Sequence, residues 1–371
     1  MQLINESIQE SQEVVFFLDN QDSLEGLNKI PINKYQKAIV FCDQNLKKTW
    51  WKRIESILTK QILIDGLMFL EPSEQTKSLE YHNILVDYLG EKKCSRDTLI
   101  IVIGGGTVLD AIAYLASTYM RGIPLMMIPT TLIGQADAST AGKTCINTSY
   151  SKNALGTLYL PKFVYNNVSF LKTNSSFEMR QGFSEIFKYG LLGSEHLLTL
   201  LSKYARENND STLLEILSET IKVRMLLRKK DPLSSNFGHT FGHALEKISD
   251  YSVNHGDAIS AGMVMAMHFS IEEDILNCEL VEEIIDSMTE LGLNTKISNN
   301  ISPEKLTQLM LTDKKSSNTE IRLVLIEDIA KPLKIKDSHF YSVDPKRIQS
   351  FLEGFNKNSR FIDASLWDSL R

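Results

Sequence analysis

The stretch TLIIVIGGGTVLD, residues 98–110, decides the fold class of this chain. Its first six residues are β-branched or aliphatic, as in a buried strand, and Gly104, Gly105 and Gly106 follow directly. Beyond the glycines, apolar residues recur at helical spacing to about residue 117. A strand that passes through glycines into a helix is typical of a parallel α/β sheet. The unpaired N–H groups that begin such a helix favour an anion, although a plain tight turn would have the same sequence.

Apolar runs on both sides of this stretch continue the alternation. Residues 38–42 (AIVFC), 61–64 and 123–128 (IPLMMI) indicate strands, and residues 79–89 indicate a helix. After about residue 175 the patterns favour helices at 177–204, 212–230, 241–249, 258–277 and 281–291, with a late strand at 321–326. We therefore predict an α/β N-terminal domain over residues 1–174, followed by a mostly α-helical domain over residues 175–371.

Composition excludes several classes of protein. The 371 residues are 43% hydrophobic and 23% charged, with a net charge of −6, as in a soluble globular protein. A nucleic-acid or polybasic membrane binder should be basic, and no apolar stretch is long enough to cross a bilayer. The first residues have no apolar segment of the signal-peptide type. The four cysteines form no CxxC pair, so we expect reduced thiols in a cytoplasmic protein that binds neither nucleic acid nor membrane.

A cluster of histidines is the clearest chemical signal. The segment NFGHTFGHALE, residues 236–246, places His239 and His243 four residues apart, on one face of a helix. His255 follows in NHGD, so three of the seven histidines fall within 17 residues. Two of them with one carboxylate would suit a zinc site that keeps a coordination position open. Each histidine taken alone would more commonly be a hydrogen-bonded or solvent-facing residue.

A carboxylate that could complete such a site stands in GFSEIFKYG, residues 182–190. The neighbours Phe183 and Phe187 should be buried, which brings Glu185 towards the core. A buried carboxylate needs a cation or a metal, and Lys188 lies one turn later on the same face. A surface ion pair between the two is the alternative.

Polar residues also follow the predicted strands. Asp43 and Asn45 stand just past residues 38–42, where α/β proteins place ligand contacts, and Asp43 could accept hydrogen bonds from ribose hydroxyls. An ordinary turn with a helix cap would use the same residues.

A second polar segment, DASTAGKT (residues 137–144), follows the strand at 123–128 and is expected to be a loop. It lacks the spacing of a Walker A loop, but with Lys152 and Asn153 it could hold an anionic substrate. Arg121, Lys222 and the run DKK at 313–315 add further cations, although charge runs are usually solvated surface.

Taken together, these motifs resemble the sugar phosphate cyclase superfamily, and most closely its 3-dehydroquinate synthase family. The resemblance covers roughly residues 36–330, and the motifs occur in the family's order. SEQTK at 73–77 resembles the family's GExxK segment, and GGGTVLD at 104–110 resembles its GGGVxxD pyrophosphate loop. The resemblance implies that the first domain binds NAD, through Asp43, Asn45, Glu74, Lys77, Gly104, Gly105, Gly106, Asp110, Thr130, Thr131 and Asp137.

The same resemblance makes the second domain a metal- and substrate-binding domain. Its implied metal ligands are Glu185, His239 and His255, with zinc as the usual ion and cobalt as a substitute. The implied catalytic residues are Lys143, Lys188, Asn236 and His243, and the implied substrate-binding residues are Arg121, Lys152, Asn153, Lys222 and Lys315. In the family the arginine reaches across a dimer interface, so we expect a homodimer.

The reaction implied by the resemblance belongs to the shikimate pathway of aromatic amino acid biosynthesis. 3-Deoxy-D-arabino-heptulosonate 7-phosphate, a small sugar phosphate, is cyclised to 3-dehydroquinate with release of phosphate. NAD would be used catalytically, and a divalent metal would orient and acidify a substrate hydroxyl.

One segment departs from the family pattern. Residues 228–235 are about four residues short, and Pro232 stands where the family has the arginine that is expected to bind the substrate carboxylate. A related cyclase acting on a neutral sugar phosphate such as sedoheptulose 7-phosphate is therefore an alternative. A metal- and NAD-dependent polyol dehydrogenase is a second, although it would not need the lysines at 143, 152, 188 and 315. A non-catalytic relative would leave the metal-ligand set unexplained.

Overall fold

The computed structural model describes residues 2–9, 12–149, 151–230, 234–297, 301–313, 319–336 and 338–357, and the chain divides into two compact units. Residues 1–179 and 209–221 form the first unit, and residues 180–208 and 222–371 form the second. The division therefore does not fall at one point of the sequence. The predicted fold class is confirmed, because an α/β unit with a parallel sheet is followed by a largely helical one.

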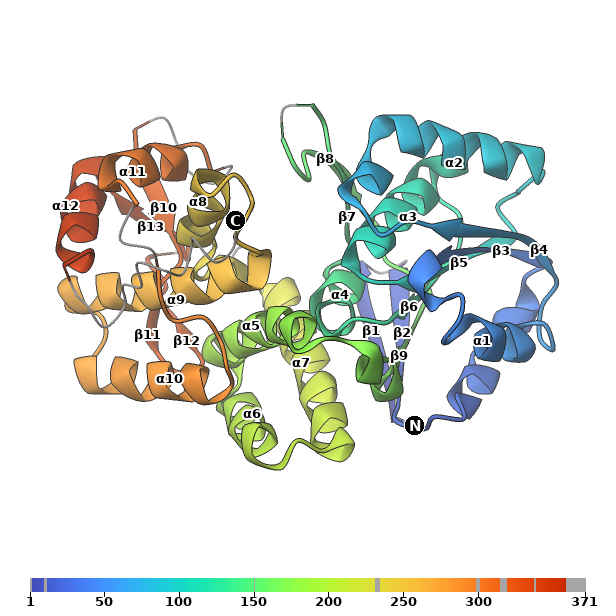
Figure 1. The fold of residues 1–371 in the computed structure, drawn as a ribbon, viewed down its shortest axis with the longest axis horizontal. Helices are drawn as coiled ribbons and strands as arrows, with labels where there is room; N and C mark the ends of the chain where they lie inside the picture. The colour runs from blue at the N-terminus through green and yellow to red at the C-terminus, as the bar shows by residue number, and fades with distance from the viewer. Residues whose placement is uncertain are drawn as a thin grey trace. The chain divides into compact units, whose positions relative to one another are not determined.

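The first unit is built on a seven-stranded sheet with the order β1-β2-β9-β6-β5-β3-β4 (Figure 1). Neighbouring strands run parallel, apart from the antiparallel hairpin of β1 and β2 at one edge. In sheet order the strands are Gln2–Gln9, Gln12–Asp19, Phe163–Asn167, Leu125–Pro129, Thr98–Gly104, Lys37–Asp43 and Ile64–Leu70.

Helices cover both faces of this sheet. Val40 and Cys42 of β3 pack in one core cluster with α1 (Trp51–Leu58). Phe41 between them points to the other face, where its ring lies 6.1 Å from that of Tyr88 on α2 (Leu79–Glu91). Figure 1 shows α1 on one side of the sheet and α2 and α3 (Gly106–Thr118) on the other. Because successive side chains of a strand face opposite ways, a strand covered on both faces is apolar throughout.

Most elements predicted for the first unit are confirmed. Strands occur at or beside residues 38–42, 98–103 and 123–128, and helices include 79–89 and 108–117. The strand predicted at 61–64 is wrong, because a turn closed by the bond from Ile62 N to Leu58 O (3.0 Å) occupies residues 58–62. The strand begins only at Ile64, as β4. β1, β2 and β9 were not predicted.

The second unit consists mainly of helices, with two short strand pairs, β10–β13 and β11–β12. The single helix predicted over 177–204 is two helices, because Ser194 ends the first and its hydroxyl caps the second at Leu197 N (3.2 Å). The helices are α5 (Ser176–Gly193), α6 (Glu195–Glu207), α7 (Asp210–Lys230), α8 (His239–Ile248), α9 (His255–Glu272), α10 (Cys278–Glu290), α11 (Pro303–Leu311) and α12 (Pro345–Phe355). The strands are β10 (Ile321–Leu323), β11 (Ile326–Asp328), β12 (Lys331–Pro332) and β13 (Tyr341–Val343). α5 and α7 each begin in the first unit and end in the second.

Glycines allow the two histidine-bearing helices, α8 and α9, to pack backbone against backbone. Gly238, just before α8, has φ +74°, a conformation that residues with a Cβ rarely adopt. A Cβ added at Gly262 of α9 would lie 2.2 Å from the carbonyl oxygen of Gly238 and 2.8 Å from the nitrogen of Gly242. The close approach fixes the positions from which α8 and α9 present their histidines.

Among the described residues, no helix has both the length and the apolar composition needed to cross a membrane.

The glycine contact predicts a loss of stability on substitution. Gly262→Ala should lower the free energy of unfolding by about 1–3 kcal/mol, because α9 must move away from a backbone that cannot yield. Gly354→Ala in α12, where an added Cβ meets nothing within 4 Å, is the matched control and should be neutral or slightly stabilising. Urea unfolding of both variants measures the difference. Equal stabilities would contradict the importance of this contact.

Candidate metal and cofactor sites

Helix α5 carries a buried acid and a buried base into the second unit. Glu185 and Lys188 are only 1% and 2% exposed, because every residue of α5 from Gln181 to Leu192 is buried. Phe183 and Phe187 are buried as predicted. The ammonium of Lys188 donates a hydrogen bond to Oε2 of Glu185. The surface ion pair considered from the sequence is therefore excluded.

The other oxygen of Glu185 faces two histidines. Its Oε1 lies 3.2 Å from Nε2 of His255 at the start of α9, and 3.6 Å from Nε2 of His239 at the start of α8. One ligand atom from each of the three residues lies within 4.8 Å of the others. Residues up to 70 positions apart in the sequence thus converge on one point.

Acceptors behind the two histidines fix how the rings are oriented. Nδ1 of His239 lies 3.1 Å from the carbonyl oxygen of Phe237, and Nδ1 of His255 lies 3.3 Å from Oε1 of Glu246. A carbonyl and a carboxylate can only accept, so each Nδ1 carries a hydrogen. Each Nε2 is then the atom directed at Glu185, which is the arrangement that a metal-binding histidine requires.

The charges of the cluster balance one another. Burial alone would raise the pKa of Glu185, but Lys188, and then His239 and His255, hold it well below its usual value. Burial alone would lower the pKa of His255, but its hydrogen bonds to Glu185 and Glu246 raise it to about 10. Without a metal the His255 ring is therefore cationic, and a metal ion would displace the proton on Nε2.

These residues fit a divalent cation. Two imidazole nitrogens and one carboxylate oxygen are the ligand set of a catalytic zinc site, in which further positions stay open for water or substrate. Glu246, Phe237 and Lys188 supply the outer contacts that such ligands need.

Other site residues predicted for the second unit lie outside this ligand cluster. His243 is one turn after His239 on α8, with ring centroids 5.3 Å apart, but its Nδ1 is bonded to Asp313 at 2.9 Å. Asn236 ends a short helix, Ser234–Asn236, three residues before His239. Lys222 is exposed on α7, and Lys315 lies outside the described residues.

The residues predicted to bind NAD gather where parallel strands of the first unit end. Gly104 ends β5, and its carbonyl oxygen accepts from Thr130 N after β6 (3.0 Å). α3 begins at Gly106 with no side chain capping its first N–H groups. A Cβ at Gly105 would lie 3.1 Å from the Thr131 side chain, so this turn approaches its neighbour closely. Free N–H groups at a helix start suit a phosphate.

Asp43, at the end of β3, also acts as a helix cap, which was the alternative considered from the sequence. Its Oδ1 accepts from Asn45 N at 2.8 Å, which makes it the cap of a short helix, Gln44–Leu46. Burial raises the pKa of the Asp43 carboxyl, and the bond from Asn45 opposes the shift. The structure thus places Asp43 and Asn45 at the expected edge of the sheet. There the two residues form a helix cap.

A buried lysine joins predicted cofactor and substrate residues in the first unit. Lys77, 5% exposed, donates to Oδ2 of Asp110 (2.8 Å) and Oδ1 of Asn153 (2.6 Å). Burial by itself would lower the pKa of Lys77, but Asp110, with Cys145 and Glu74, outweighs burial and raises it. Glu74, on the same short helix, accepts from Asn147 Nδ2 at 2.6 Å. The segment Glu74–Lys77 is therefore tied to the hairpin of β7 (Lys143–Ile146) and β8 (Leu155–Leu158).

The loop predicted over residues 137–144 is wrong except at Gly142, because Lys143 and Thr144 belong to β7 and the residues before Gly142 are helical. A π-helical turn, Gly134–Ala138, and α4 (Ser139–Ala141) occupy its first half. Gln135 holds this turn, because its amide donates to the carbonyl oxygens of Pro129 (3.1 Å) and Asn167 (2.9 Å). Asp137 lies in the π-helical turn. Three predicted cations of this unit are exposed, namely Arg121, Lys143 and Lys152.

Several supporting residues were missed from the sequence. Cys145 lies 3.3 Å from Asp110 and 3.5 Å from Lys77, and burial raises the pKa of its thiol to about 12. Glu246 stands three residues after His243, in the histidine motif itself, and that spacing was an available signal. Asp313 showed only as part of a charge run.

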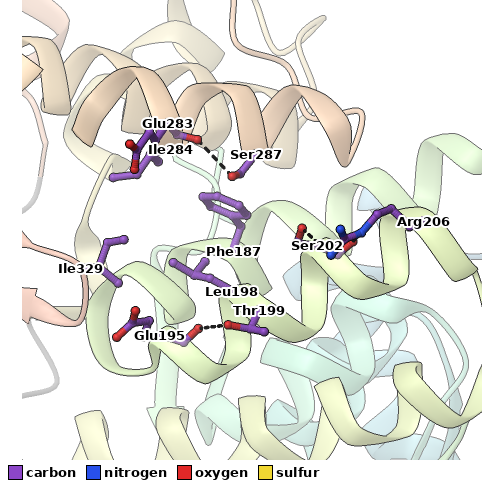
Figure 2. Close-up of a pocket in the computed structure, with 10 residues that line it drawn as sticks. All are labelled: Phe187, Glu195, Leu198, Thr199, Ser202, Arg206, Glu283, Ile284, Ser287 and Ile329. Atoms are coloured by element: carbon purple, nitrogen blue, oxygen red, sulfur yellow. Dashed lines mark hydrogen bonds between the residues drawn. The ribbon is translucent and has the colours of Figure 1, made fainter. Parts of the chain in front are cut away.

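A surface groove in the second unit is separate from the metal cluster. Figure 2 shows it beside Phe187, lined by side chains from α5, α6 and α10. Its volume is about 280 Å³. None of the predicted site residues lines it. Its lining residues are Phe187, Glu195, Leu198, Thr199, Ser202, Arg206, Glu283, Ile284, Ser287 and Ile329.

Sequence comparison places both halves of the chain in one family. The protein-family model described as "3-dehydroquinate synthase N-terminal" matches residues 67–181. The family model described as "3-dehydroquinate synthase C-terminal" matches residues 182–316. A 3-dehydroquinate synthase from Desulforamulus reducens is 32% identical over 321 residues, which are 84% of this chain and 89% of that protein.

Solved structures share the fold. The chain matches a 2-deoxy-scyllo-inosose synthase complexed with carbaglucose-6-phosphate, NAD⁺ and Co²⁺, with a TM-score of 0.82 and 19% identity, over 95% of this chain and 100% of that one. It also matches a 2-epi-5-epi-valiolone synthase from Streptomyces hygroscopicus with NAD⁺ and Zn²⁺ bound, with a TM-score of 0.80 and 20% identity, over 95% and 99%.

The convergence of ligands predicts loss of metal on substitution of His239. His239→Ala should weaken zinc binding by more than the roughly 10–100-fold that outer contacts are worth, because it removes a donor atom. Isothermal titration of zinc into the metal-free protein measures the affinity. His196→Ala, at an exposed position on α6, is the control and should bind zinc normally. Stoichiometric, tight binding by His239→Ala would contradict the ligand set.

Proposed function

Because the chain belongs to the 3-dehydroquinate synthase family, we propose that it cyclises 3-deoxy-D-arabino-heptulosonate 7-phosphate to 3-dehydroquinate with release of phosphate. The observation that carries the proposal is the convergence of Glu185, His239 and His255 in a chain that matches both family models. A carbon–oxygen lyase of this kind must first oxidise a substrate hydroxyl, and such a cluster prepares a hydroxyl for oxidation.

Each unit would bind one cofactor: NAD in the first unit and a divalent metal ion in the second. When bound, a divalent ion supplies Lewis acidity at substrate oxygens, and NAD supplies a hydride acceptor that is restored within the cycle. We propose zinc at Glu185, His239 and His255, with cobalt as a substitute. The uncapped N–H groups at the start of α3 and the network of Lys77 with Asp110 would hold NAD.

The chain's own side chains have three tasks in this proposal. Lys188 keeps Glu185 ionised and occupies one of its oxygens, so that the other faces the ion. Cations bind the phosphate and carboxylate of the substrate, for which we propose Arg121, Lys143, Lys152, Lys222 and Lys315. Asn153 and Asn236 would add neutral hydrogen bonds, and His243 would contact the substrate directly.

The altered segment before Asn236 favours a second candidate. Pro232 stands at the spacing of the arginine expected to bind the carboxylate, and Pro232 lies outside the described residues. A cyclase for a neutral sugar phosphate, such as sedoheptulose 7-phosphate, would not need that arginine.

A cytoplasmic location is supported by the cysteines. Cys42, Cys94, Cys145 and Cys278 are free thiols, as expected in a reducing compartment. The net charge of −6 supports a small-molecule partner over nucleic acid.

A homodimer is supported by exposed residues of the first unit. Met120 and Arg121 both have positive φ values, 50° and 66°, in a turn that leaves Met120 45% exposed. Tyr159 bonds the carbonyl oxygen of Ile123 (2.6 Å) and so ties this turn to the end of β8, on which Leu158 is 73% exposed. Exposed apolar side chains on joined elements are typical of an interface, and we propose that a second copy of the chain covers them.

An assay of the purified protein tests the reaction. Incubation with NAD⁺, zinc and 3-deoxy-D-arabino-heptulosonate 7-phosphate should release inorganic phosphate without accumulation of NADH, because the hydride returns to the product. A parallel incubation uses sedoheptulose 7-phosphate.

Phosphate from sedoheptulose 7-phosphate alone would move the assignment to the second candidate. Accumulation of NADH with simple polyols would instead show a dehydrogenase and contradict a cyclase.

The proposed interface predicts the effect of a charge at Leu158. Leu158→Asp should convert a dimer into a monomer in sedimentation velocity, because the carboxylate would be desolvated between two copies. Leu63→Asp is the matched control: Leu63 is 64% exposed elsewhere in the same unit and should leave the dimer intact. Monomeric wild-type protein, or two equally dimeric variants, would rule out this interface.

A further inference from the structure

His243 is a histidine with an anchored ring outside the ligand cluster. Its ring lies 5.3 Å from that of His239 and stacks on that of His255 at 6.3 Å, with 30° between the planes. Its side chain is 36% exposed, so one edge of the ring reaches solvent. Its Nδ1 lies 2.9 Å from Oδ2 of Asp313.

Asp313 is a buried acid outside the ligand set of Glu185, His239 and His255. Its side chain is 4% exposed, and it stands two residues after the end of α11. A buried carboxylate must be compensated, and an imidazole N–H at 2.9 Å contributes to that. Because an ionised carboxylate only accepts, the hydrogen of the His243 ring is placed on Nδ1, and Nε2 presents a lone pair.

A second hydrogen bond lies next to the contact between His243 and Asp313 and provides a comparison for it. Lys247, one turn after His243 on α8, donates to the hydroxyl of Thr312 at 2.8 Å. The same two segments are thus joined by two adjacent hydrogen bonds. Both bonds hold α8 to the end of α11, but only one of them sets the state of a ring beside the metal ligands.

Resting on the proposed function, we propose that Asp313 is a positioning residue for the reaction. It holds His243 in the Nδ1–H form and aims Nε2 as a hydrogen-bond acceptor for an O–H group of the substrate. With the other tautomer, Nε2 would carry a hydrogen, so it could donate to the hydroxyl oxygen but could not accept the O–H hydrogen. Asp313 is not one of the three proposed ligands, so its replacement should change metal binding far less than catalysis.

Two substitutions separate positioning from packing. Asp313→Asn should lower kcat by about 10²–10⁴-fold, because its amide can donate to Nδ1 and reverse the tautomer. Zinc affinity and the KM for the sugar phosphate should change far less. Lys247→Met removes the adjacent bond and should keep kcat within about threefold of the wild type. Equal losses in both variants, or an unchanged kcat in Asp313→Asn, would show that the contact only packs α8 against α11.

A spectroscopic measurement decides the tautomer without any substrate. In zinc-loaded protein labelled with ¹⁵N-histidine, the His243 ring nitrogens should show the hydrogen on Nδ1, and His243→Gln assigns the signals. In Asp313→Asn the shifts should reverse or average. A hydrogen on Nε2 in the wild type would overturn the proposal even in an active enzyme. Absence of phosphate release from either sugar phosphate, with the hydrogen on Nδ1, would instead mean that the proposed function has failed.

Discussion

A buried carboxylate, that of Glu185, is the constraint on which the second unit depends. A charge that is 1% exposed must be compensated by other charges, and removal of a partner from such a pair typically costs about 3–5 kcal/mol. Lys188 compensates one oxygen, and His239 with His255 meets the other. The helices that carry these partners are held by glycines in close contact, so one electrostatic requirement fixes the positions of α5, α8 and α9.

Each of the three histidine rings, His239, His243 and His255, is held by a hydrogen-bond acceptor at its Nδ1. His239 is held by a backbone carbonyl, His255 by Glu246 and His243 by Asp313, in each case through Nδ1. All three rings therefore direct Nε2 away from their anchors. Rings fixed in this way need little reorganisation when a ligand binds, which is the advantage of preorganised polar groups in a catalytic site. In the first unit a buried cation is compensated in a similar way, because Lys77 donates hydrogen bonds to Asp110 and Asn153.

Some expectations succeeded because they depend on local sequence. The glycines after β5 and the spacing of His239 and His243 express the period of one strand or one helix. The strand predicted at 61–64 failed because a turn and the start of β4 compete there for the same apolar residues. The loop predicted over residues 137–144 failed because Gln135 is bonded to Asn167, which is 32 residues away.

The sequence by itself determined the fold class and the family, and it supplied candidates for the metal site and the NAD site. It could do so because strand and helix periods, turn glycines and ordered motifs are local properties of the chain. Only the tertiary structure decided that Glu185 and Lys188 are buried together, and which distant residues satisfy the other buried charges. Asp313 reaches His243 across 70 residues, and Lys77 reaches Asn153 across 76. Such pairs leave no periodic trace, since hydrogen bonding depends on distance in space, and only the packing of whole helices and strands brings the two ends together.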